Sequence, residues 1–245
     1  MSHLKSKTQA VQNFLSKVTE LTGDLVNVND YNKVAFIVAN PYYESYRLKL
    51  GDPCCNDANL IAEFYNNHGY KCFGIIDPTR EEFVKYLKYF TQQNNINDLI
   101  VYYAGHGNSI PDRSFKYVNG KCVPCEKDED DGRDETWVFK NGDLIDDEMK
   151  EIWNENKCGN ILVISDSCHS ATVVETSRNN VSSICGCKDS QCSIQLQRNG
   201  IFTFWLMDFA KKNLVLKSLM TVINKKIGDY GQNCVLTGNR EKLVL

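Results

Sequence analysis

Short apolar runs recur along this chain and alternate with segments of helical periodicity. Each run is continuous, a pattern typical of strands that are buried on both faces of a sheet. The runs predict strands at residues 33–39, 71–76, 98–104 and 160–165, and a last short strand at 233–237.

Between these runs, apolar residues recur with the spacing of one helix face. The pattern predicts helices over residues 56–67, 80–93, 202–211 and 214–227, and another over residues 4–21. Strands that alternate with helices need crossover connections, which place the strands parallel in one sheet. We therefore predict an α/β fold with a mostly parallel sheet flanked by helices on both faces.

Two polar segments interrupt this alternation. Short strands are expected in residues 108–140 only at 115–118 and 136–139, whereas residues 176–199 are rich in Ser, Asn, Cys and Gln and show little periodicity. Loops this long in a compact domain are usually functional or disordered. Because each segment follows a predicted central strand, we expect the two to form the walls of one cleft.

The composition is that of an ordinary globular protein, with 42% hydrophobic and 24% charged residues among 245. A formal net charge of −3 argues against a nucleic-acid partner. No apolar run approaches the roughly 18 residues that a membrane span needs, and the N-terminus lacks the apolar centre of a signal peptide. We therefore expect a cytoplasmic protein with no membrane partner.

The chain has 11 cysteines, an odd number that cannot all pair. In a reducing compartment most of them should be free thiols that pack as small apolar residues. A zinc site is an open alternative, although the spacing supports it weakly. The cysteines that such a site would draw on are Cys122, Cys125, Cys185, Cys187 and Cys192.

Two of the predicted strands end abruptly in reactive residues. The strand at 98–104 is followed by His106 between two glycines, and the strand at 160–165 is followed by Cys168. Parallel strands place such ends at one carboxyl edge of the sheet, where open α/β sheets carry their chemistry. The pair predicts a cysteine nucleophile with an imidazole base, and the amides of Gly107 and Cys168 are candidate donors to an oxyanion.

These strand ends also resemble a known family. Tyr103-Ala104-Gly105-His106-Gly107 and Asp166-Ser167-Cys168-His169-Ser170 are similar to the two catalytic motifs of metacaspases, in the caspase-like clan of cysteine peptidases. Further similar stretches lie at 55–58, 131–148 and 231–238, so the resemblance covers about residues 30–240. It implies a caspase-like fold and a cysteine endopeptidase in which His106 and Cys168 form the catalytic dyad.

The resemblance also implies a substrate class. Metacaspases cleave after Arg or Lys, and their pocket for that side chain is lined by acidic residues, which correspond here to Asp57 and Asp166. A carboxylate pair suits a guanidinium and repels an acidic side chain. Ala104 stands in this pocket where the family usually has Ser.

Calcium is the cofactor that the resemblance implies. Many metacaspases are activated by calcium, which carboxylates between the catalytic strands bind. The corresponding residues here are Asp134, Asp146 and Asp147, together with Glu175 after the cysteine. Acidic oxygen ligands suit this ion, whereas the alternative is a solvated acidic loop.

We divide the chain into an N-terminal helix or extension (residues 1–29) and a caspase-like peptidase domain (residues 30–245). By resemblance it is a type I-like core without a prodomain, and we expect a monomer. Self-processing is a further expectation, with candidate sites in the exposed loops at Lys121, Lys127, Arg178 and Lys188.

Two alternatives stay open. Ala104, and Ala171 in place of a usual Gly, favour a caspase-fold regulatory or scaffold protein with weak activity. A peptidase of the same clan that cleaves after Asn or Asp is the other.

Overall fold

The computed structural model describes residues 7–43, 48–111, 115–118, 121–124 and 132–245, with only the backbone for 115–118 and 121–124. Its main sheet has seven strands in the order β1-β3-β2-β4-β10-β11-β12. All neighbours pair in parallel except β12, which is antiparallel to β11. The strands are β1 (Thr19–Glu20), β2 (Lys33–Ala39), β3 (Lys71–Ile76), β4 (Asp98–Ala104), β10 (Asn160–Asp166), β11 (Val181–Cys185) and β12 (Val235–Thr237).

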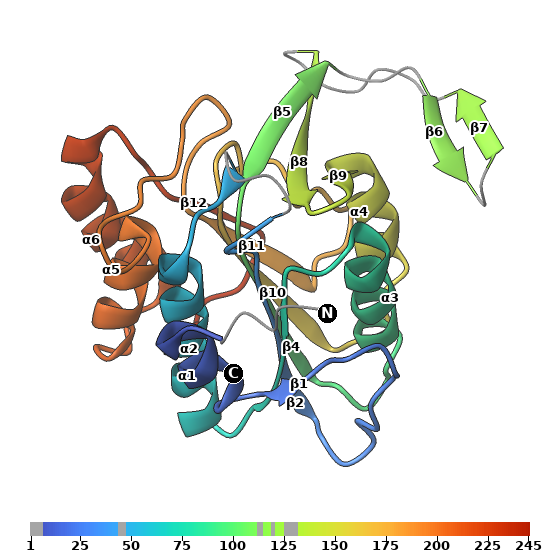
Figure 1. Ribbon diagram of the computed structural model, residues 1–245, viewed down its shortest axis with the longest axis horizontal. Coiled ribbons are helices and arrows are strands. Elements are labelled where there is room, and N and C mark those ends of the chain that lie inside the picture. The colour runs from blue at the N-terminus through green and yellow to red at the C-terminus, as the bar shows by residue number, and fades with distance from the viewer. Residues whose placement is uncertain (1–6, 44–47, 112–114, 119–120, 125–131) are drawn as a thin grey trace, which may run out of the picture.

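Helices cover both faces of this sheet (Figure 1). One face carries α1 (Gln9–Leu15), α2 (Asp52–Asn67), α5 (Ile201–Ala210) and α6 (Leu216–Ile227), and the other carries α3 (Arg80–Thr91) and α4 (Asp146–Asn154). Successive residues of a strand point to opposite faces, so a fully apolar strand supplies both layers. In β2, for example, Ile37 packs toward α2 and Phe36 packs toward α3.

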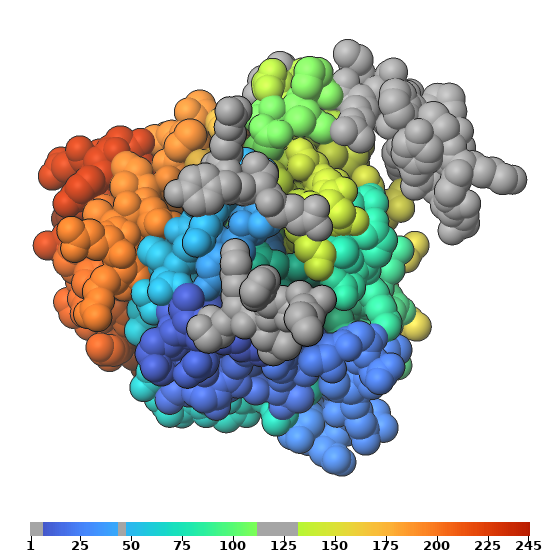
Figure 2. All heavy atoms as spheres, viewed as in Figure 1, coloured from blue at the N-terminus to red at the C-terminus, as the bar shows by residue number. Residues whose placement is uncertain are grey.

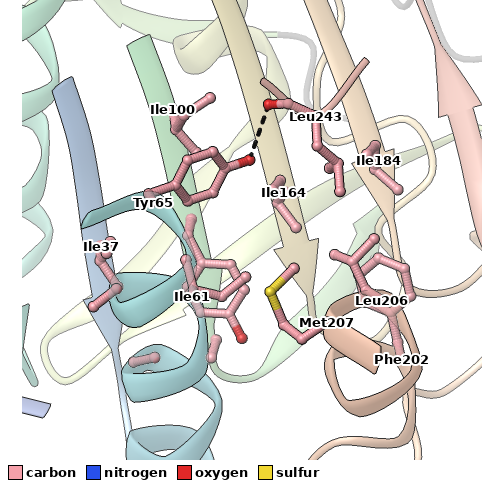
Figure 3. Packing of buried hydrophobic residues seen from close by; sticks show 14 of the residues in the cluster. Ile37, Ile61, Tyr65, Ile100, Ile164, Ile184, Phe202, Leu206, Met207 and Leu243 are labelled. Atoms are coloured by element: carbon pink, nitrogen blue, oxygen red, sulfur yellow. Dashed lines mark hydrogen bonds between the residues drawn. The ribbon is translucent and has the colours of Figure 1, made fainter. Parts of the chain in front are cut away.

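The layer between the sheet and helices α2 and α5 is closely filled (Figure 3). Ile100 and Ile164 of the central strands meet Ile61 of α2 and Leu206 of α5, and all four side chains are fully buried. Tyr65 joins this layer and donates a hydrogen bond from its hydroxyl to the Leu243 carbonyl at 3.3 Å. The central strands are thus fixed by packing on both faces, which fixes where their ends lie.

Smaller sheets extend the domain beyond the end of β4. Strands β5 (Gly107–Pro111), β8 (Arg133–Phe139) and β9 (Gly142–Ile145) form an antiparallel sheet, and β6 (Phe115–Val118) pairs with β7 (Lys121–Pro124) in a two-stranded ribbon. Figure 1 shows this ribbon beyond the tip of the β5–β8 pair. The same face drawn as spheres has α5 and α6 on one flank and α3 on the other (Figure 2).

The predicted α/β architecture, a mostly parallel sheet with helices on both faces, is confirmed, but the expected N-terminal helix is wrong in extent. The predicted helix over residues 4–21 is a short helix, Gln9–Leu15, followed by β1, which adds to the sheet beside β3. Gly74 of β3 explains the change, because Phe14 and Val18 occupy the space where its side chain would be. Packing over this glycine ends the helix early and returns the chain to the sheet.

The two segments expected to be loops contain more structure than their composition indicated. Residues 176–199 include β11, an inner strand whose Ser182 and Ser183 hide any hydrophobic period. In residues 108–140 the strands predicted at 115–118 and 136–139 are present as β6 and within β8, and β5 and β7 add to them. Beyond this segment, α4 begins in the acidic stretch at Asp146. Helix α2 also begins earlier than expected, at Asp52, with a proline in its first turn. Among the described residues, no helix is both long and apolar enough to cross a membrane.

Candidate active site

The two reactive strand ends lie side by side. Strands β4 and β10 are hydrogen-bonded neighbours, and their register pairs Ala104 with Asp166 at the last position of each strand. The amide of Gly105 then donates to the Asp166 carbonyl at 3.4 Å. His106 and Cys168 therefore leave the sheet from equivalent positions. We call residues 105–107 the histidine arm and residues 167–169 the cysteine arm.

The two arms touch through their backbones. A Cβ atom built on Gly107 would lie 1.9 Å from the carbonyl oxygen of Cys168, far inside van der Waals contact. Only glycine leaves room for this approach. The amides of Gly107 and Cys168, which we predict to stabilise an oxyanion, thus belong to segments in direct contact.

The histidine arm is held by hydrogen bonds from three other segments. The His106 amide donates to the Tyr43 hydroxyl at 2.6 Å, and its carbonyl accepts from the Tyr103 hydroxyl at 2.8 Å. On the ring, Nε2 lies 2.7 Å from the Leu48 carbonyl. A carbonyl only accepts, so Nε2 carries a proton, and in the neutral imidazole Nδ1 is then the basic nitrogen.

Tyr43, which holds the His106 amide, has a strained backbone. Its backbone has a φ of 45°, uncommon for a bulky residue, and its ring packs on the His106 ring at 5.1 Å between centroids. The carboxylate of Asp77 accepts from the amides of Tyr42 and Tyr43 and holds this turn. Neither Tyr43 nor Asp77 was predicted for the site, because their roles depend on this turn.

In the cysteine arm, Cys168 itself has fewer hydrogen bonds than His106. Cys168 is partly buried, and its Sγ accepts a hydrogen bond from the Ser193 amide at 3.2 Å. Burial raises the pKa of the Cys168 thiol to about 11, more than the Ser193 amide lowers it. The thiol is therefore protonated in the resting protein at neutral pH, and it needs a base to become a nucleophile.

Both arms line one small cavity of about 110 Å³. The same cavity is lined by all three residues predicted for the substrate pocket, Asp57, Asp166 and Ala104. The structure thus brings the predicted nucleophile, base and acidic residues together, although they come from α2, β4, β10 and the two arms. A larger cavity of about 700 Å³ lies between α2 and α5, away from both arms.

The two carboxylates are buried side by side. The Asp57 carboxylate accepts from the Asn199 side chain and the Gly200 amide, each at 2.7 Å, and Asp166 accepts from the Ser193 and Thr203 hydroxyls, also at 2.7 Å. Burial raises the pKa of both, and the nearby charge of Asp166 raises that of Asp57 further. A cation entering the cavity would relieve this cost of ionisation.

Gly200 makes the close approach of the carboxylates possible. A Cβ atom on this residue would lie 2.4 Å from one oxygen of Asp166 and 3.1 Å from one of Asp57. Its φ is −63°, so the requirement is for space rather than for an unusual backbone. The sequence analysis missed Asn199 and Gly200, because an Asn-Gly dipeptide by itself indicates only a turn.

The predicted calcium ligands do not form one ligand set in this structure. Both oxygens of the buried Asp146 carboxylate accept backbone amides, from Glu135 and Asp147, at 2.8 Å. Glu175 forms an ion pair with Lys150 at 2.8 Å. Within the described ranges, no three His, Cys, Asp or Glu side chains are grouped so as to hold a metal ion.

Two remaining expectations are placed only in part. Cys185 and Cys187 are buried and Cys192 is exposed, whereas the side chains of Cys122 and Cys125 lie outside the described residues, as does that of Lys121 and the whole of Lys127. Ala171 is buried but has no positive φ, whereas His169, two residues earlier, has a φ of 47°. The turn after the nucleophile therefore does not need glycine at position 171.

Comparison with known proteins identifies the family. The caspase-domain family model matches residues 32–242. Metacaspase-1 of Lodderomyces elongisporus is 29% identical over 139 residues, which make up 49% of this chain and 29% of that protein. The chain thus spans less than a third of the length of this relative.

Solved structures agree on the fold. A Geobacter sulfurreducens protein matches with a TM-score of 0.65 and 21% identity, over 86% of this chain and 95% of that one. Caspase-1 from Spodoptera frugiperda matches with a TM-score of 0.62 and 14% identity, over 93% and 96%. The resemblance to metacaspases seen in the sequence is confirmed, and this chain belongs to the caspase-domain family of cysteine peptidases.

Proposed function

We propose that this chain is an endopeptidase that cleaves after Arg or Lys, with Cys168 as nucleophile and His106 as base. The observation that carries the proposal is the cavity in which the thiol, the imidazole and two buried carboxylates meet. Each component comes from a different part of the chain, so their meeting is not explained by local sequence.

The chemistry follows from the protonation states. The resting Cys168 thiol keeps its proton, so His106 Nδ1 takes that proton as the sulfur attacks the substrate carbonyl. The oxygen of the tetrahedral intermediate lies toward the amides of Gly107 and Cys168. His106 then gives the proton to the leaving amine, and the acyl-enzyme forms. A water molecule that has lost a proton to His106 finally hydrolyses the thioester.

The preference for a basic side chain follows from Asp57 and Asp166. Two buried carboxylates with raised pKa values are costly to ionise in an empty cavity. A guanidinium or ammonium offsets that cost, whereas an Asp or Asn side chain does not. We therefore expect Arg and Lys substrates to be selected at this cavity.

The experiment is cleavage of fluorogenic peptides that end in Arg, Lys, Asp or Asn. We expect the first two to be cleaved, and Cys168→Ala to abolish cleavage. The buried Cys234 does not line the cavity, so Cys234→Ala serves as the matched control and should retain activity. Asp57→Asn and Asp166→Asn should lower kcat/KM for Arg substrates.

Cleavage after Asn or Asp would replace the specificity proposal while keeping the dyad. The absence of cleavage of every peptide by folded wild-type protein would favour the regulatory or scaffold function instead. A reactive-thiol probe separates these cases, because a scaffold has no need of a reactive Cys168.

Calcium activation is a separate proposal. It requires the Lys150 ammonium to give up Glu175, because that pair holds one of the predicted ligands. Calorimetry with calcium on wild type and on Asp146→Ala/Asp147→Ala tests it, since equal heats would exclude these residues as ligands. We also propose that the protein is cytoplasmic, monomeric and able to cleave itself. Light scattering tests the monomeric state. Incubation of the purified protein, with Cys168→Ala as the control, tests self-cleavage.

A further inference from the structure

A second thiol lies beside the proposed nucleophile. Burial raises the pKa of the Cys168 thiol, and the neighbouring Cys192 side chain raises it further. Cys192 is also the exposed member of the nine cysteines whose side chains the structure describes. The pair therefore combines one thiol that solvent reaches with one that the cavity shelters.

The backbones around these thiols run close together. The His169 amide donates to the Gln191 carbonyl at 3.0 Å, and the Ser193 amide donates to Cys168 Sγ at 3.2 Å. Both residues that flank Cys192 are thus hydrogen-bonded to Cys168 or to the residue that follows it, which places the two cysteines next to each other. A disulfide between them requires their Cα atoms to lie about 4.4–6.8 Å apart, which neighbouring hydrogen-bonded segments can provide.

Other nearby cysteines are less suited to react with Cys168. The thiol of Cys187 is buried and donates to the carbonyls of Ser167 at 3.0 Å and Gln191 at 3.4 Å. Burial raises its pKa to about 12. Cys54 lines the cavity but is buried on α2. Cys187 and Cys54 have no exposed thiol through which an oxidant enters.

We propose that Cys192 is a redox-modification site that forms a reversible disulfide with Cys168 when a low-molecular-weight disulfide, such as oxidised glutathione, is present. The inference rests on the proposed function for its effect on activity, because the bond removes the nucleophile. Formation of the bond itself does not depend on that function.

Two exchange steps account for every atom. The Cys192 thiolate attacks one sulfur of oxidised glutathione, so a Cys192–glutathione bond forms, the glutathione disulfide breaks and one glutathione thiolate leaves. Cys168 then loses its proton, and its sulfur attacks the Cys192 sulfur. The second glutathione leaves as a thiolate and takes up a proton. The two protein thiols are oxidised by two electrons, and oxidised glutathione is reduced to two thiols.

The disulfide would also reach the substrate cavity. Ser193 follows Cys192 directly, and its hydroxyl donates to Asp166 at 2.7 Å. Fixing Cys192 to Cys168 therefore ties the nucleophile to the segment that supports the acidic pocket. A reductant restores both, so the modification acts as a switch rather than as damage.

The test uses the reduced full chain, freed of reductant and incubated with oxidised glutathione. We expect the intact mass to fall by two hydrogens and peptide mapping to find Cys168 linked to Cys192. Peptidase activity should fall at least tenfold with the same time course and return on addition of dithiothreitol. Because exchange requires the thiolate, both rates should increase with pH.

Two variants make the test specific. Cys192→Ser should form no internal disulfide and should keep its own untreated activity, whereas Cys187→Ser should behave as wild type. The proposal is overturned if Cys192→Ser loses activity as fast as wild type, or if glutathione stays on Cys192 with no internal bond. If the linkage forms in a chain that cleaves no peptide before treatment, the proposed function fails and the disulfide stands.

Discussion

The histidine and cysteine arms begin at paired positions of neighbouring strands but are supported differently. His106 has hydrogen bonds at its amide, its carbonyl and its ring, to Tyr43, Tyr103 and Leu48. Cys168 has one backbone amide on its sulfur and other thiols close by. The orientation of the proposed base is thus fixed by several hydrogen bonds, whereas the sulfur of the proposed nucleophile accepts one. Residues at paired strand ends can therefore differ in how firmly their surroundings hold them.

The largest expected effect comes from breaking the contact between the arms. In Gly107→Ala the new methyl group would collide with the Cys168 carbonyl, so the arms must separate. A displacement of about 1 Å at reacting groups costs about a hundredfold in rate, and we expect at least that loss in kcat/KM. Gly228→Ala is the control, because nothing lies within 4 Å of its Cβ position. Equal kinetics of the two variants would contradict the contact.

The protonation state of Cys168 predicts the next largest effect. Its pKa of about 11 means that the thiolate fraction, and with it the rate of alkylation by iodoacetamide, should increase about tenfold for each pH unit between 7 and 9. Mass spectrometry of the Cys168 peptide measures this rate. A plateau below pH 8 would show that a thiolate–imidazolium pair already exists in the resting protein.

Support of the histidine arm is tested by removing one hydroxyl. Tyr43→Phe keeps the ring but leaves the His106 amide without its acceptor, which costs about 1–1.5 kcal/mol and should lower kcat about tenfold with little change in KM. Tyr86→Phe is matched to it, because the Tyr86 hydroxyl accepts the Gly23 amide at 2.7 Å far from the cavity. If both variants lose similar thermal stability but only Tyr43→Phe loses kcat, the Tyr43 hydroxyl positions His106 and does not act only through folding.

A smaller effect should appear in the pH dependence of KM. The pKa of Asp57 is raised by burial and by Asp166, so lowering the pH protonates the pocket and weakens its attraction for a cation. KM for Arg peptides should therefore fall as the pH increases, and Asp57→Asn should flatten the profile. By the same linkage, ionising a carboxyl of raised pKa makes the unliganded protein less stable as pH increases. An unchanged profile in Asp57→Asn would assign the titration to another group.

The central sheet and the two arms at its edge could be predicted because the sequence patterns that indicate them are local. A continuous apolar run that ends in Gly-His-Gly or Ser-Cys shows both the strand and its reactive end. The acidic residues of the pocket needed the family resemblance, since Asp57 alone reads as an ordinary acid of a first helical turn.

What the sequence did not show depends on distant parts of the chain. Tyr43 acts through a strained turn, and Gly200 acts through space that two carboxylates occupy. Strand β11 was not predicted because it contains serines on both faces, which gives it no hydrophobic pattern. An inner strand tolerates serines when their hydroxyls are hydrogen-bonded, as the Ser183 hydroxyl is to the Thr237 hydroxyl at 2.6 Å. Such features follow from tertiary contacts, which no local pattern records.

The pairing of β5 with β8 sets Pro111 opposite Arg133, so the chain between them begins and ends at one place. Because the entropy of loop closure grows only slowly with loop length, lengthening or shortening that connection costs little once the paired strands hold its ends together. The strands that align the two arms lie outside it. A change in the length of this connection therefore leaves the two arms and the strands that align them in place.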